Sequence, residues 1–142
     1  MASKKRPSLP KNYKPTDKEK FMSARQREYF RRKLLDWRSE LLGESSETLR
    51  NMQEESLSES DMADRASLEA DRALELRTRD RQRKLISKID EALDRIEDGS
   101  YGYCEETNEP ISLRRLEARP IATLSIEAQE RHERMERTRR DD

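Results

Sequence analysis

From residue 16 to residue 109 the chain contains no proline, and this long stretch is dense in charged side chains. Proline interrupts helices, so its absence leaves room for very long ones. Charged residues make up 44% of the sequence and apolar residues only 31%, which is too little for a broad core. Long helices with a narrow apolar stripe fit this composition. Disorder competes as an interpretation, and apolar periodicity argues against it for the middle of the chain.

The first part of the stretch has the spacing of a coiled coil. Ser23 and Gln26 form a capping-box pattern, which predicts that a helix starts near Ser23. Apolar side chains then follow at spacings of four, three and four, the pattern of a coiled-coil seam. They are Phe30, Leu34, Trp37 and Leu41. After Gly43, which weakens the helix, the stripe is predicted to move to Leu42, Ser45, Leu49 and Met52.

A turn is predicted between about Glu55 and Asp61, because several residues there are good caps for a second helix. The caps are Ser56, Ser58, Ser60 and Asp61. The second helix is predicted to run to Asp98 and to stop at Gly99. Its apolar positions near the turn are Ala66, Ala70, Ala73, Leu74 and Leu76, and those near its end are Leu85, Ile89, Ala92, Leu93 and Ile96. The small alanines predict a close approach of the two helices near the turn.

Glycine and proline divide residues 99–124 into short segments, which predicts a small irregular module. Ser125 is a cap for a last helix that is expected to fray in residues 137–142. The fold is therefore expected to be mainly α: a long antiparallel coiled-coil hairpin on a small globular module with a C-terminal helix. Three parts are predicted: a flexible basic segment over 1–20, the hairpin over 21–98 with its tip near 56–66, and the module with its helix over 99–142.

The net charge of zero hides a strong segregation of charge. The first 20 residues are basic, residues 44–64 are acidic, and residues 77–88 are basic again. A nucleic-acid-binding domain would normally have a basic excess overall, and the acidic tip would be repelled by phosphates. At that tip Asp61 and Asp64 are three residues apart and face nearly the same way, with the small Ala66 beside them. Helix capping explains Asp61 but not Asp64. A functional role for the tip is therefore an open interpretation.

The basic row of the second helix also has two interpretations. Spacings of four, three and four place four cations on one helix face. They are Arg77, Arg81, Lys84 and Lys88. The row is either a solvated ladder with Asp80 as a local partner or a surface for an acidic protein rim or a phosphorylated ligand.

Several function classes lack the residues they need. The sequence contains no nucleophile–base pair, glycine-rich phosphate loop or dinucleotide fingerprint, so an enzyme is not expected. One cysteine, Cys104, and one histidine, His132, are too few for a four-ligand zinc site or an internal disulfide. Cys104 is interpreted as a small partly buried side chain rather than a redox sensor, and His132 as a surface residue. With no apolar membrane span and no signal peptide, the chain is expected to be cytoplasmic.

Ordered motifs along about residues 20–135 resemble the DksA/TraR family of RNA polymerase-binding transcription factors. They begin with Phe30-Arg31-Arg32 and Trp37-Arg38 in the first helix and Asp61-x-x-Asp64-Arg65-Ala66 at the tip. The second helix adds Leu76-Arg77-x-Arg79-Asp80-Arg81 and Arg83-Lys84-Leu85-Ile86. The densest matches are Gly102-Tyr103-Cys104-Glu105, Ile111 and Arg114-Arg115-Leu116-Glu117-Ala118-Arg119-Pro120. Each motif alone is weak, but their common order is specific.

The resemblance implies a monomer that binds bacterial RNA polymerase, inserts its hairpin into the secondary channel and binds no specific DNA sequence. Asp61, Asp64 and Ala66 would approach the active-site region, and Arg77 and Arg81 would face the channel rim. Family members act with the alarmone ppGpp, repressing ribosomal RNA promoters and favouring amino-acid biosynthesis promoters. The ppGpp site shared with polymerase would include Leu85, Lys88 and Arg119.

Two departures from the family pattern stand out. The four cysteines of the family's zinc finger would occupy positions 104, 107, 125 and 128, where this chain has Cys104, Thr107, Ser125 and Ala128. This predicts a metal-free, one-cysteine variant held by apolar packing and hydrogen bonds, with activity that persists under zinc limitation. Gln129 replaces a lysine usual in the family's last helix, which predicts weaker coupling to ppGpp.

Two other functions remain alternatives. A passive coiled-coil adaptor explains the seam but not the pair of tip aspartates. A transcript-cleavage factor of the channel-binding type would also have paired acids at its tip, since cleavage needs carboxylates that hold a metal ion near the reacting phosphate.

Overall fold

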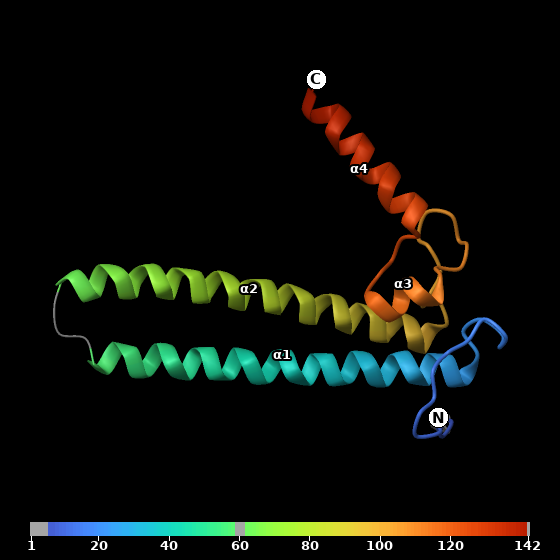
Figure 1. Ribbon diagram of the computed structural model, residues 1–142, viewed down its shortest axis with the longest axis horizontal. Helices are drawn as coiled ribbons and strands as arrows, with labels where there is room; N and C mark the ends of the chain where they lie inside the picture. The colour runs from blue at the N-terminus through green and yellow to red at the C-terminus, as the bar shows by residue number, and fades with distance from the viewer. Residues whose placement is uncertain (1–5, 59–61, 142) are drawn as a thin grey trace. The chain divides into compact units, whose positions relative to one another are not determined.

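The computed structural model describes residues 6–58 and 62–141, and no side chain is described for residues 55–64 or 140–142. Four helices follow one another along the described chain (Figure 1): α1 (Ala24–Ser58), α2 (Met62–Asp98), α3 (Leu113–Ala118) and α4 (Ile126–Asp141). The described residues contain no strand, only an isolated bridge between Tyr103 and Pro110. The mainly α prediction is confirmed. None of the described helices is apolar enough over a sufficient length to cross a bilayer.

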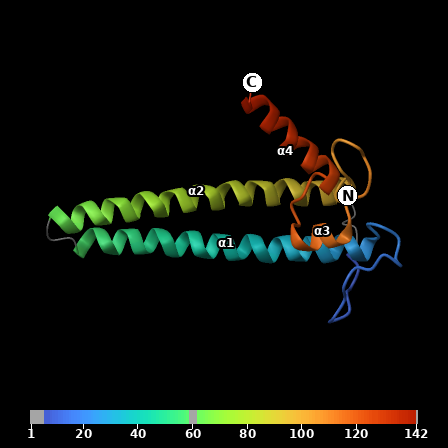
Figure 2. The ribbon, with the colours of Figure 1, turned by 45° about the horizontal axis from the view of Figure 1, so that its top comes forward.

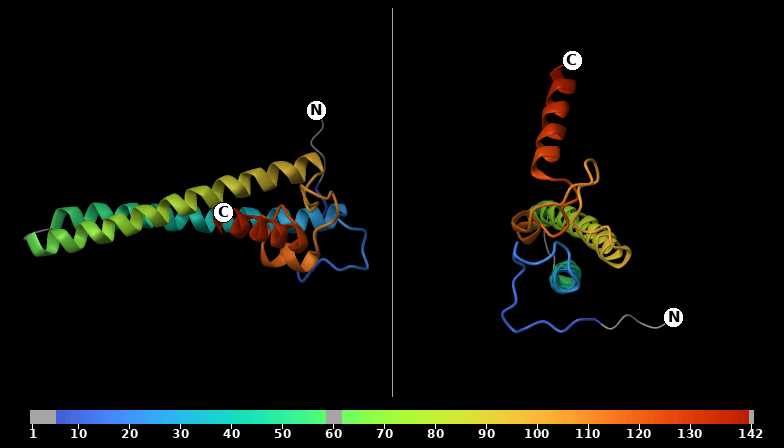
Figure 3. Two further views of the ribbon diagram at one scale, coloured as in Figure 1. Left: turned by 90° about the horizontal axis from the view of Figure 1, so that it is seen from above. Right: turned by 90° about the vertical axis from the view of Figure 1, so that its right-hand side faces the viewer.

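The chain divides into two compact units. The base unit comprises Met1–Leu34 and Glu91–Asp142, and the shaft unit comprises Leu35–Asp90. Each long helix therefore contributes to both units. Within the shaft unit, α1 and α2 run antiparallel side by side (Figure 2) and cross one another when seen from above (Figure 3). This is the helix pair that the sequence predicts.

The start of α1 is fixed by its own capping residues. The backbone N–H of Gln26 donates to the Ser23 hydroxyl at 3.3 Å, as the capping-box pattern predicts. The Gln26 side chain reaches one residue further back than in a capping box and accepts the N–H of Met22 at 2.8 Å, while its amide donates to the Thr16 carbonyl at 3.1 Å. Gln26 thus ties residues 16–22 to the first turn of the helix.

Further contacts hold the segment before α1 on the base unit. Arg6 pairs with Glu97 at 3.3 Å, and Tyr13 donates its hydroxyl proton to Glu19 at 2.7 Å. The ring of Tyr13 meets that of Tyr29 edge to face, with 6.1 Å between centroids. These contacts attach the described part of the segment, residues 6–23, while the flexibility of residues 1–20 stays a prediction.

Helix ends agree with the sequence in part. α2 ends at Asp98, and Gly99 follows with φ +89°, its N–H bonded to the Arg95 carbonyl, as predicted. α1 continues to Ser58, so the expected turn from Glu55 starts too early, and residues 59–61 lie outside the described part. α4 extends to Asp141 and shows no break in residues 137–141, unlike the expected fraying.

The core of the base unit is apolar and closely packed. Phe30 and Leu116 are fully buried, and the Phe30 ring lies 5.7 Å from that of Tyr101. The Tyr101 hydroxyl donates to the Pro120 carbonyl at 2.7 Å, and burial raises the pKa of this phenol. Glu117 of α3 accepts hydrogen bonds from Tyr29 at 2.5 Å and Lys33 at 2.9 Å, which fix α3 against the start of α1.

The α3 helix was not predicted from the sequence. It has six residues, and the Ser112 hydroxyl caps it by accepting the N–H of Arg115 at 3.2 Å. Residues 113–118 are too few for a hydrophobic period to stand out. The serine three residues before Arg115 is the only local signal, and Ser112 lies within the region predicted to be irregular.

The interior of the shaft unit confirms the predicted stripe at Ser45 and Met52, which are half-buried, and corrects it elsewhere. Leu42 and Leu49 are exposed, as are Leu74, Leu76 and all three alanines expected to bring the helices together. The half-buried positions continue the spacing of the seam formed by Phe30, Leu34, Trp37 and Leu41. On α1 they are Ser45, Thr48 and Met52; on α2 they are Leu68, Arg72, Glu75, Thr78 and Arg79, followed by the buried Gln82.

The continuing seven-residue register explains this outcome. Leu34 and Leu41 are buried seven residues apart, and Thr48 occupies the next position of the same series. A helix turns at a constant rate, so a stripe cannot move by one position without a local irregularity, and α1 passes Gly43 unbroken. Beyond Leu41 the register therefore places Ser45 and Thr48 inside and Leu42 and Leu49 outside.

Candidate functional site

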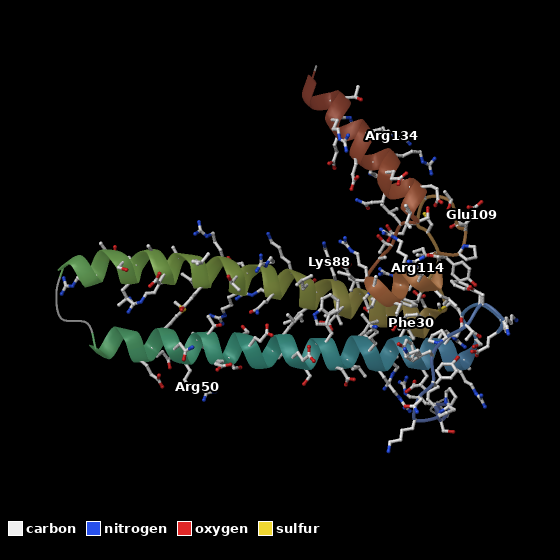
Figure 4. The ribbon with its side chains drawn as sticks, in the orientation of Figure 1. Phe30, Arg50, Lys88, Glu109, Arg114 and Arg134 are labelled. Atoms are coloured by element: carbon white, nitrogen blue, oxygen red, sulfur yellow. The ribbon has the colours of Figure 1, made fainter. Side chains whose placement is uncertain are left out.

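The basic row predicted on α2 is present and exposed. Arg77, Arg81, Lys84 and Lys88 are all exposed on one face of the helix. Lys88 points away from α1 (Figure 4). Among the side chains that the structure describes, residues 6–54 and 65–139, no acidic one forms an ion pair with any of the four, Asp80 included. The four cations are available to a partner.

The tip lies at the limit of the described structure. Asp61 falls outside the described residues, and Asp64 lies in the first turn of α2 without a described side chain. Ala66 is exposed. Carboxylates in the first turn of a helix are favoured by the macrodipole. The role of all three tip residues stays a prediction.

The residues expected to meet ppGpp fall into different units. Leu85 and Lys88 lie three residues apart on α2 in the shaft unit, with Leu85 half-buried and Lys88 exposed. Arg119 belongs to the base unit, where it follows α3 and is exposed. Gln129, on α4, is half-buried and donates to Glu133 at 3.4 Å. Neither Lys88 nor Arg119 has an ion-pair partner among the described side chains.

Two of the other three positions of the expected zinc finger, Thr107 and Ser125, contact Cys104, which is buried with only 1% exposure. The Thr107 hydroxyl and the backbone N–H of Ser125 both bond to the Cys104 sulfur. The Ser125 hydroxyl accepts the N–H of Ala128 at 3.2 Å and so caps α4. Ala128 is fully buried and has no donor atom.

This set of side chains does not fit a zinc ion. Structural zinc requires four thiolate or imidazole ligands, and here one thiol stands with a neutral hydroxyl, a hydroxyl used for capping and a methyl group. The described residues also contain no group of three His, Cys, Asp or Glu side chains placed to hold a metal. His132 contacts Glu106 and not Cys104.

The Cys104 thiol has an unusual acidity. Burial raises its pKa, but hydrogen bonds from the Thr107 hydroxyl and from the backbone N–H groups of Ser125, Thr107 and Glu106 outweigh burial and lower the pKa to about 6. Hydrogen-bond donors favour the negative thiolate over the neutral thiol, which is also what a positive metal ion would do. Sequence reasoning identified Cys104 as a small buried side chain but not this shift.

Comparison with known proteins shows which family the chain resembles. Residues 26–96 match the model of the DnaK suppressor protein DksA, N-terminal domain, and residues 99–134 match the prokaryotic dksA/traR C4-type zinc finger. The chain belongs to the DksA family. The prediction made from the motifs is therefore confirmed, and the zinc-finger model matches although three of its four cysteine positions hold other residues.

Individual DksA proteins cover nearly the whole chain. The RNA polymerase-binding transcription factor DksA of Caulobacter vibrioides is 68% identical over 131 residues, 92% of each chain. The protein of the same name from Escherichia coli K12 is 45% identical over 115 residues, 81% of this chain and 76% of its own. A solved structure of transcription factor DksA2 from Pseudomonas aeruginosa has a TM-score of 0.77 and 47% identity, covering 82% of this chain and 90% of its own.

Proposed function

We propose that this protein is a transcription factor that binds RNA polymerase. The observation that supports this most strongly is the 68% identity, over 92% of the chain, to a protein named for that activity. The relatives compared above are named as transcription factors, which agrees with the lack of catalytic motifs in the sequence. Binding rather than catalysis is the proposed activity.

The proposed mode of binding is insertion of the helix pair into the secondary channel of polymerase. Asp61, Asp64 and Ala66 would then approach the active-site region, where two carboxylates can change the local potential. Arg77 and Arg81 would bind an acidic rim of the channel. Their full exposure and lack of internal partners among the described residues support this role.

The proposed effect is on initiation and depends on ppGpp. The protein would repress ribosomal RNA promoters and favour amino-acid biosynthesis promoters. Lys88 and Arg119 are the proposed cations for the clustered phosphates, with Leu85 as an apolar neighbour of Lys88. Gln129 is uncharged, so we expect weaker coupling to ppGpp than in relatives that have a lysine there.

The proposed state is a cytoplasmic monomer that does not read DNA sequence. The zero net charge and the acidic segment over residues 44–64 support the absence of a DNA-binding surface, since phosphate binding needs a basic excess.

The central experiment compares Asp64→Asn with Glu69→Gln, a matched loss of an acid at an exposed position on the same helix. Purified protein and polymerase transcribe a ribosomal promoter. Repression by the wild type and by Glu69→Gln, but not by Asp64→Asn, is expected. Equal repression by all three proteins would reject the tip mechanism.

The same experiment separates the other functions. Shortened transcripts from stalled complexes would identify a cleavage factor. A protein that never binds polymerase would be an adaptor, and the proposed function would fail.

The role of the two cations is tested by titrating ppGpp against Lys88→Ala and Arg119→Ala. Arg114→Ala is the control, because Arg114 is an exposed arginine of the same unit as Arg119. Both test variants should need roughly tenfold more ppGpp for half-maximal repression, the size expected for one lost charge-assisted contact. An unchanged requirement would remove these residues from the proposed site.

We also propose that residues 99–142 fold without zinc. Incubation with a strong chelator should leave the thermal midpoint and promoter repression unchanged, and metal analysis of the purified protein should find no stoichiometric zinc. Unfolding on chelation would contradict this proposal.

A further inference from the structure

The short helix α3 depends on its neighbours for its position. It has six residues, and an isolated helix of that length is marginal at best in water, so contacts to the rest of the base unit must hold it. The Ser112 hydroxyl caps its first turn by accepting the N–H of Arg115 at 3.2 Å, and Leu116 is fully buried. At the other end of α3, the Glu117 side chain reaches across to α1.

The Glu117 carboxylate binds two side chains of α1 at once. Its Oε1 accepts a hydrogen bond from the Tyr29 hydroxyl at 2.5 Å and another from the Lys33 ammonium at 2.9 Å. Tyr29 and Lys33 are four residues apart, so they lie on the same face of α1. The ammonium of Lys33 also lies over the Tyr29 ring, 5.9 Å from its centroid. These contacts fix the end of α3 against the start of α1.

Glu117 is ionised, and cations lie around it. Burial raises the pKa of Glu117, but hydrogen bonds from Tyr29 and Lys33 and the charges of Lys33 and Lys14 lower it by more. A carboxylate without a nearby cation would repel phosphate groups. Because Lys33 offsets its charge, Glu117 can lie close to a side chain that binds an anion.

The backbone of Arg119 is tied to the end of α3 and to the segment that follows. The N–H of Arg119 donates to the Arg115 carbonyl at 2.7 Å, and its carbonyl accepts the N–H of Ala122 at 3.0 Å. The carbonyl of the next residue, Pro120, accepts the Tyr101 hydroxyl at 2.7 Å. The Arg119 side chain itself is exposed, and it has no ion-pair partner among the described side chains. The place from which the guanidinium projects is therefore set by α3.

We infer that Glu117 is a positioning residue for Arg119, because it fixes the helix from whose end the guanidinium projects. The inference rests on the proposed function, in which Arg119 binds phosphates of ppGpp. A cation that is held in place before its ligand arrives loses less conformational entropy on binding. Tyr29 and Lys33 act through Glu117 in this arrangement.

The test removes the contacts of Glu117 one at a time and together. Tyr29→Phe removes the hydroxyl and keeps the ring, and Lys33→Met removes the ion pair and keeps most of the side-chain length. Glu117→Ala removes both contacts. Glu117→Gln keeps an oxygen that can accept the Tyr29 hydroxyl. If Glu117→Ala does not fold, the two substitutions on α1 decide the question.

Two contacts elsewhere in the base unit provide matched controls, since neither involves α3. Tyr13→Phe also removes a hydroxyl that donates to a carboxylate, because Tyr13 donates to Glu19 at 2.7 Å. Arg6→Met also breaks an ion pair, because Arg6 pairs with Glu97 at 3.3 Å. General losses of stability in the base unit will affect the controls and the test variants alike.

The measurement is repression of a ribosomal promoter by purified protein and polymerase as ppGpp is titrated. Glu117→Ala should raise the ppGpp concentration for half-maximal repression roughly threefold to tenfold, the factor that corresponds to ordering one long side chain on binding. Tyr29→Phe and Lys33→Met should each raise it about threefold, and Glu117→Gln should raise it less than Glu117→Ala. Repression without ppGpp should be unchanged in all of them. Both controls should need the same ppGpp concentration as the wild type.

Two results would overturn the inference while the proposed ppGpp site stands. In the first, Arg119→Ala raises the required ppGpp concentration but the variants of Glu117, Tyr29 and Lys33 do not. In the second, the two controls raise it as much as the test variants, so that Glu117 contributes only to general stability. A wild type that does not respond to ppGpp, or a response that Arg119→Ala leaves unchanged, would instead reject the proposed site and this inference with it.

Discussion

The base unit and the shaft unit differ in the side chains that they bury. The base unit buries aromatic and aliphatic side chains such as Phe30, Tyr101 and Leu116 almost completely. The shaft unit buries Gln82 and half-buries Glu75, while leaving Leu74 and Leu76 in water. Packing in the base unit stabilises the isolated protein. The shaft unit retains apolar surface that the isolated protein does not use.

The largest effect should follow from opening the core of the base unit. Phe30→Ala removes a fully buried ring that packs on Tyr101, and we expect it to lower the free energy of unfolding by about 3–5 kcal/mol. Leu35→Ala, at an exposed position on the same helix, should cost about 0.5 kcal/mol or less. Urea titration followed by circular dichroism measures both. Similar losses of free energy of unfolding for the two variants would contradict the difference in burial between Phe30 of the base unit and Leu35 of the shaft unit.

A second test examines the hydrogen-bonded thiol that stands in the base unit. The pKa of Cys104 is about 6 in the folded protein and near the ordinary 9 in the unfolded chain, so the unfolded state binds more protons between these values. The contribution of Cys104 to stability should be greatest above pH 9 and be lost as pH falls to about 6, with a slope of at most about 1.4 kcal/mol per pH unit. Cys104→Ser should flatten this part of the profile.

The measurement is the free energy of unfolding as a function of pH for the wild type and Cys104→Ser. A pH dependence that remains in both proteins comes from other titrating groups. Glu117 is one of them, because hydrogen bonds from Tyr29 and Lys33 lower its pKa by more than burial raises it. Identical profiles would show that Cys104 is not held as a thiolate.

The third test concerns the polar interior of the shaft. Gln82→Leu removes a buried amide whose Oε1 has no partner among the described residues, and it returns the exposed Glu44 to water. We expect the substitution to stabilise the protein by about 1 kcal/mol. A loss of stability would mean that the Glu44–Gln82 hydrogen bond outweighs apolar packing in this interior.

The smallest effect on stability is expected at an exposed leucine of the shaft unit. Leu74→Ala changes a leucine that is 58% exposed, so the free energy of unfolding should change by less than about 0.5 kcal/mol. Thermal unfolding gives the value. A loss as large as that of Phe30→Ala would place Leu74 in a folded-state core and remove it from the surface available to partners.

The sequence predicted the base-proximal seam well, because Phe30, Leu34 and Leu41 are apolar where the helix register needs them. It also predicted the start of α1 and the end of α2. Farther along α1 it was right for Ser45 and Met52, which are half-buried, and wrong for Leu42 and Leu49, which are exposed. Periodicity locates leucines, but only the continuing register shows that Thr48 rather than Leu49 faces inward. A pattern that assumes leucines are buried cannot identify a segment in which they are exposed.

The candidate site was likewise predictable only in part. The spacing of the α2 cations was enough to place them on one face, and their exposure agrees with it. The absence of zinc ligands was readable from positions 104, 107, 125 and 128. The lowered pKa of Cys104 was not, because it depends on backbone N–H groups whose direction is set by the loop and not by any residue type.

Gly43 affects how strongly the α1 helix is held in the shaft unit. It lies within the unbroken α1, and a methyl group built there would meet no atom within 4 Å, so no neighbour requires a glycine at this place. Alanine would strengthen the helix by about 1 kcal/mol. In the proposed binding mode, a helix weakened at Gly43 would bend more readily as it enters the channel.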